Sequence, residues 1–148
     1  MAAVLLDSSI LIDLLRGRGG ATRRLRALVA RGDTPCVCAI NVDEIARGIR
    51  ESELASAVPL FEGLRIAPLG AAEGRQSGDW RRRFAERGLT LSQADCLVAA
   101  AAAGIGARLA TGNAKDSRCP VSRSNIGPPV SPDGQAAARP SSARSTTS

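Results

Sequence analysis

At 148 residues the chain is long enough for one domain with a buried core. It has 20 basic and 14 acidic residues, a net charge of +6, and half of this excess lies in residues 117–148. The positive charge is consistent with binding of a polyanionic substrate, and it is equally consistent with a charge excess that only keeps the protein in solution. No apolar run is long enough to cross a membrane, and the four cysteines give neither a zinc-type pair nor a disulfide framework. The N-terminal apolar stretch is too short for a signal peptide, so we expect a soluble, cytoplasmic protein.

Short apolar runs predict four strands, at residues 4–6, 36–40, 64–67 and 108–110. Helical patterns lie between them. The first predicted helix starts after a cap at Ser8 or Ser9, the next covers residues 22–30, and a third starts after a cap at Asn41. Two more cover residues 52–61 and 71–87, and the last extends from a Ser92 cap to Ala103. This alternation predicts an α/β fold, with a short parallel sheet of four to five strands covered by helices on both faces.

Four acidic residues lie near predicted element ends. Asp7 follows the first strand and Asp116 follows the last, while Glu44 and Asp95 each come three residues after a predicted helix cap. The carboxyl ends of parallel strands and the amino ends of the following helices share one edge of a sheet. The chain contains no histidine, so carboxylates gathered at that edge predict a site for a hard cation such as Mg²⁺ or Mn²⁺.

Each acid also has a structural interpretation. Asp7 is placed to cap the first helix, and Asp116 is placed as an ordinary loop residue. Glu44 and Asp95 both fit a capping box, in which an acidic side chain bonds back to the start of its helix. The functional interpretation therefore depends on the four residues as a set.

Four ordered segments resemble the successive motifs of PIN-domain ribonucleases, above all the VapC-type toxins of bacterial toxin–antitoxin modules. They are residues 4–9, 40–48, 91–101 and 109–116, and the resemblance covers residues 1–116. It implies a PIN-like fold and catalytic, metal-binding roles for Asp7, Glu44, Asp95 and Asp116, with Ser8 and Asn113 as supporting polar groups.

The same resemblance implies hydrolysis of RNA with Mg²⁺ or Mn²⁺, a small cognate antitoxin that covers the active site, and a homodimer. Arg16, Arg47 and residues 81–83, all arginine, are either phosphate contacts or solvated helix faces. The few aromatic residues are expected in the core, so RNA recognition would rest on backbone charge and shape. The alternative function is a PIN-like binding module without catalysis. A flavodoxin-like or response-regulator-like fold is not supported, because no adjacent acidic pair follows the first predicted strand and no lysine directly follows a later one.

The sequence departs from the family after Asp116. Residues 117–148 are rich in Ser, Pro, Ala, Gly and Arg, which predicts a disordered tail. A family-like Asp-Phe-Pro-Met-Pro becomes the observed Asp-Ser-Arg-Cys-Pro if one thymine is lost, so we hypothesise a frameshifted end. A strand-like peptide in the alternative reading frame would support this hypothesis, and its absence would refute it.

Overall fold

The computed structural model describes residues 1–110. The predictions made for Asn113, for Asp116 and for the tail at 117–148 lie outside these residues.

Within residues 1–110, four short strands form one parallel sheet in the order β3-β2-β1-β4. They are β1 (Ala3–Leu6), β2 (Thr34–Val37), β3 (Arg65–Ile66) and β4 (Arg108–Ala110). β1 is central, with Leu5 opposite Cys36 of β2 and Leu109 of β4. The predicted parallel sheet is therefore confirmed, although β2 and β3 are shorter than the apolar runs suggested.

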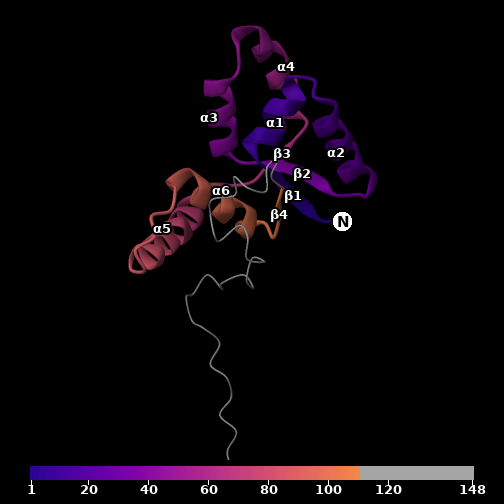
Figure 1. Cartoon of the computed structure of the whole chain (residues 1–148). Coiled ribbons are helices and arrows are strands. Elements are labelled where there is room, and N and C mark those ends of the chain that lie inside the picture. The colour runs from indigo at the N-terminus through magenta and orange to yellow at the C-terminus, as the bar shows by residue number, and fades with distance from the viewer. Residues whose placement is uncertain (111–148) are drawn as a thin grey trace, which may run out of the picture.

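In the described part of the chain, six helices connect and cover these strands (Figure 1). They are α1 (Ser8–Leu15), α2 (Gly19–Ala30), α3 (Ala39–Gly48), α4 (Glu51–Glu62), α5 (Ala71–Ala85) and α6 (Gln93–Gly104).

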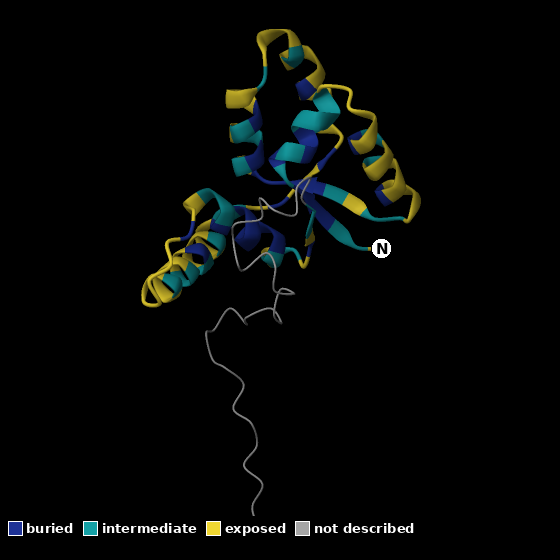
Figure 2. Ribbon diagram, in the orientation of Figure 1, coloured by how far each residue is buried: buried dark blue, intermediate teal, exposed yellow. Residues whose placement is uncertain are grey.

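The two faces of β1 belong to different parts of the core, because successive side chains of a strand point to opposite faces. Val4 and Leu6 pack in a cluster with buried residues of α1, α2 and α3. Leu5 packs in a second cluster with the alanine-rich face of α6. Figure 2 shows the buried residues concentrated where the helices meet the sheet. The sheet is thus covered on both faces, as predicted.

Three helix starts differ from the sequence-based prediction. The N-cap of α1 is Asp7, and neither Ser8 nor Ser9 holds that position. α2 begins at Gly19, close behind α1, which ends where Gly17 adopts the left-handed conformation at φ 68°.

The largest difference lies between β2 and α3. The apolar run was expected to remain a strand to residue 40, with Asn41 as the helix cap, but β2 ends at Val37 and Cys38 is the N-cap of α3. The Asn41 side chain explains the earlier start, because its Oδ1 accepts a hydrogen bond from the Cys38 backbone N–H at 3.0 Å. This bond satisfies a donor that a helix start otherwise leaves unpaired. Glu44 consequently lies in the second turn of α3, where a capping box does not use it.

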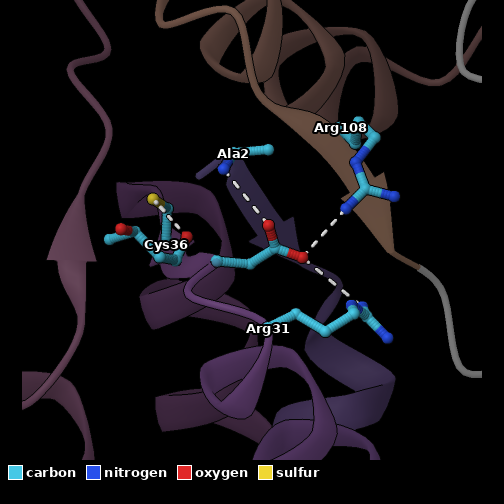
Figure 3. Close-up of polar contacts among 6 residues, drawn as sticks. Ala2, Arg31, Cys36 and Arg108 are labelled. Atoms are coloured by element: carbon cyan, nitrogen blue, oxygen red, sulfur yellow. Dashed lines mark hydrogen bonds and ion pairs between the residues drawn. The ribbon is translucent and has the colours of Figure 1, made fainter.

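The Asp33 carboxylate joins three elements at the edge of the sheet where the parallel strands begin. Asp33 accepts hydrogen bonds from the backbone N–H of Ala2 at 3.1 Å and from Arg108 at 3.1 Å, and it pairs with Arg31 at 3.4 Å. Figure 3 shows Ala2, Arg31 and Arg108 converging on this group. It therefore ties the start of β1 to the start of β4 and to the end of α2.

Within residues 1–110, every helix is too short or too polar to pass through a lipid bilayer.

Candidate active site

Asp7 lies at the carboxyl end of the central strand. Its backbone N–H donates to the carbonyl oxygen of Ala110 at 2.9 Å, which joins the ends of β1 and β4. The Asp7 side chain makes no capping hydrogen bond to α1. Its Oδ2 accepts a hydrogen bond from the Ser9 hydroxyl at 3.3 Å. Asp7 thus holds the N-cap position of α1 without a side-chain capping bond, and its half-buried carboxylate lies at the sheet edge.

Glu44 reaches the same edge through a hydrogen-bonded chain of side chains. The Ser8 hydroxyl donates to Oε2 of Glu44, and Ser8 Oγ accepts from the Asn41 side-chain amide at 3.2 Å. Ser8 is the residue directly after Asp7, so this chain links Glu44 on α3 to the start of α1. The structure thus brings Ser8 and Glu44 together.

Asp95 lies in the first turn of α6. Its backbone N–H donates to the Ser92 hydroxyl at 3.3 Å, which confirms Ser92 as the cap of this helix. The Asp95 carboxylate is half-buried. Because α6 leads into the parallel strand β4, the amino end of α6 faces the carboxyl edge of the sheet.

The described acids come from three elements that meet near this edge, since α3 and α6 are in contact and β1 pairs with β4. Within residues 1–110, however, no three His, Cys, Asp or Glu side chains are close enough to form a common metal-binding group. Asp116 and Asn113 lie outside the described residues.

The donor chemistry fits a hard cation. Carboxylate oxygens are available and the sequence has no histidine. Mg²⁺ commonly binds through one or two carboxylates and completes its shell with water and substrate phosphate oxygens. Because no three such side chains come together within residues 1–110, this mode of binding suits the chain better than an all-protein cage.

The candidate phosphate contacts are all exposed. Arg16 pairs with Glu53 of α4 at 3.6 Å, and Arg82 and Arg83 both pair with Asp79 on their own helix.

The aromatic residues were expected in the core. Phe84 packs against the buried pair Leu91 and Cys96, and Phe61 packs against the cluster around Val4. Trp80 is half-buried.

The sequence did not reveal that Asn41 links Cys38 and Ser8. Asn41 was interpreted as an N-cap, whereas it is fully buried and makes hydrogen bonds to both Cys38 and Ser8. A signal was present, because Asn41 falls four and eight residues before Ile45 and Ile49, on the apolar face of α3. Ala46, which was assigned to that face, is exposed.

The Cys38 thiol donates a second hydrogen bond to the Asn41 side-chain oxygen. Burial raises the pKa of the Cys38 thiol, so this group is protonated at neutral pH. Its Sγ donates to Asn41 Oδ1 at 3.2 Å.

Comparison with known proteins agrees with this architecture. The sequence matches the PIN domain family over residues 4–118. It is 30% identical over 111 residues to Ribonuclease VapC19 of Mycobacterium tuberculosis, covering 75% of this chain and 89% of that protein.

Solved structures show the same fold. VapBC from Salmonella typhimurium, bound to DNA, aligns with a TM-score of 0.65 at 19% identity over 76% of this chain and 88% of that chain. VapBC2 from Rickettsia felis, bound to a promoter fragment, gives 0.63 at 21% identity over 75% and 87%. The family match spans most of the sequence and includes the described acids at the sheet edge, so the chain belongs to the PIN-domain family.

Proposed function

We propose that this protein is a metal-dependent endoribonuclease that acts as the toxin of a toxin–antitoxin pair. The observation that carries the proposal is its PIN-domain membership together with 30% identity to a VapC ribonuclease. The positions of Asp7, Glu44 and Asp95 around the carboxyl edge of the sheet support it.

In this proposal Asp7 and Asp95 are the main ligands of Mg²⁺ or Mn²⁺, and Glu44 completes the acidic group. Asp116, which follows β4 in the sequence, contributes a fourth carboxylate. When bound, the ion would lower the pKa of an attacking water and neutralise charge on the scissile phosphate. The chain's own groups hold the carboxylates in place: Ser8 donates to Glu44, and Ser92 caps the turn that carries Asp95.

Substitution of the two main ligands tests the catalytic assignment. Asp7→Asn and Asp95→Asn keep the side-chain shape but remove the charge, so each should lower Mg²⁺-dependent RNA cleavage by more than the roughly 10–100-fold typical of groups that only support a ligand. Cleavage of a structured RNA is followed on gels with and without Mg²⁺ or Mn²⁺.

Asp13→Asn is the matched control, because Asp13 pairs with the exposed Arg18, which is not a candidate phosphate contact, and the change should not affect cleavage. Wild-type rates in either Asp7→Asn or Asp95→Asn would refute the assignment.

We also propose a cytoplasmic homodimer inhibited by a small cognate antitoxin. The solved relatives from Salmonella typhimurium and Rickettsia felis are VapBC assemblies. Co-expression with the product of a short neighbouring reading frame should give a co-purifying complex without ribonuclease activity. A neighbouring product that neither binds nor inhibits would contradict this part of the proposal.

A PIN-like binding module without catalysis is the second candidate. The observation that favours it is the lack of a three-acid group within residues 1–110. RNA binding without cleavage at any Mg²⁺ or Mn²⁺ concentration would select this alternative.

A further inference from the structure

We infer that Asn41 is a positioning residue that fixes the Glu44 carboxylate by orienting the Ser8 hydroxyl. The inference rests on the proposed nuclease function, in which Glu44 belongs to the metal-binding acids.

The orientation of the Asn41 amide is determined by its partners. The Cys38 backbone N–H can only donate, so the group facing it at 3.0 Å must be the amide oxygen. The amide nitrogen therefore faces Ser8 and donates to Ser8 Oγ at 3.2 Å. Asn41 is fully buried, so water does not compete for these bonds.

The amide orientation in turn determines the direction of the Ser8 proton. Ser8 has one hydroxyl proton, and its oxygen already accepts from Asn41. The proton is left to donate to Oε2 of Glu44. A carboxylate held this way loses rotamer freedom before any ion binds, which favours binding.

A simple capping role for Asn41 is the competing interpretation. Glu73 provides the comparison, since it occupies the same N3 position on α5 and accepts from the Gly70 backbone N–H at 2.8 Å. If Asn41 were only a cap, substitution of Asn41 would lower the stability of the fold and leave metal binding unchanged, as we expect for substitution of Glu73.

Three variants separate the interpretations. Asn41→Asp keeps an oxygen for the Cys38 N–H but cannot donate to Ser8. Ser8→Ala removes the hydroxyl and leaves the Asn41 cap intact. Glu73→Ala removes the corresponding cap on a different helix, α5, and serves as the control.

Mn²⁺ affinity, measured by electron paramagnetic resonance of the free ion, is the main readout. We expect Ser8→Ala and Asn41→Asp each to weaken Mn²⁺ binding by about 10–100-fold, the usual effect of losing a group that supports a ligand. The Ser8→Ala/Asn41→Asp double variant should bind Mn²⁺ about as tightly as the single variant that binds it less tightly, because both changes break the same chain of hydrogen bonds. Glu73→Ala should lower the unfolding midpoint and keep wild-type affinity.

Wild-type Mn²⁺ affinity in Asn41→Asp, or fully additive effects in the double variant, would overturn the inference. The ¹³C resonance of the Glu44 carboxyl gives a readout independent of metal, and it should move in both Ser8→Ala and Asn41→Asp. An unmoved resonance would also overturn the inference. Failure of the wild-type protein to cleave RNA would instead overturn the proposed function.

Discussion

At the scale of single residues, Asp33 and Asn41 show how polar groups organise the two edges of the sheet. Asp33 joins β1, β4 and α2 at the amino-terminal edge, and Asn41 joins α1 to α3 near the carboxyl edge. Both depend on partners distant in sequence, such as Arg108 for Asp33, so local patterns did not predict their contacts.

Asp33 should make stability depend on pH. The backbone N–H of Ala2, followed by Arg108 and Arg31, holds the pKa of Asp33 below its ordinary value of 3.8 against the opposing effect of burial. A carboxyl whose pKa is lower in the folded state stabilises the fold above the unfolded pKa, and this contribution is lost as pH falls through the folded pKa.

Asp33→Asn should therefore lower the free energy of unfolding at pH 7. Below about pH 4, the free energy of unfolding should fall less steeply with pH in this variant than in the wild-type protein. Urea unfolding across this pH range measures both effects. Asp13→Asn is the control, because Asp13 pairs with the exposed Arg18 and such surface pairs contribute little. Equal losses in the two variants would contradict the role assigned to Asp33.

At the scale of elements, three helix starts were predicted to within one residue. Ser92 starts α6 as expected, and α4 and α5 begin within one residue of their predicted starts. The start of α3 was predicted wrongly because the apolar residues before Asn41 resembled a continuing strand, whereas Asn41 lies inside the helix and bonds back to Cys38.

Ser92→Ala should destabilise α6. It removes the oxygen that accepts the Asp95 backbone N–H, and such losses cost about 1 kcal/mol of unfolding free energy. Ser92→Thr should retain most of this stability, because threonine also caps helices. Urea midpoints for the two variants measure the difference, and equal midpoints would show that the cap contributes nothing.

At the scale of the whole molecule, the alternation of strands and helices was enough to predict a parallel sheet with two covered faces. The lengths of β2 and β3 were not predictable, because an apolar run does not show where pairing stops. The sequence also predicted Asp7 and Asp95 at one sheet edge, but it could not give the Ser8 and Asn41 contacts that depend on how α1 packs on α3.

The proposed domain boundary at residue 116 leads to a further prediction. The family match ends at residue 118, so a chain of residues 1–118 should retain the cooperative unfolding and the RNA cleavage of the full chain. Denaturant titration and the cleavage assay compare the two forms. Loss of either property would show that residues 119–148 are needed.

The central claim is that acids from separate elements bind one divalent ion at the carboxyl edge of the sheet. Mn²⁺ binding measured by electron paramagnetic resonance on wild-type, Asp7→Asn and Asp95→Asn protein tests it most directly. We expect the wild-type protein to bind Mn²⁺ and each substitution to weaken this binding strongly. Wild-type affinity in the Asp95→Asn variant would contradict it, because Asp95 would then have no share in the site.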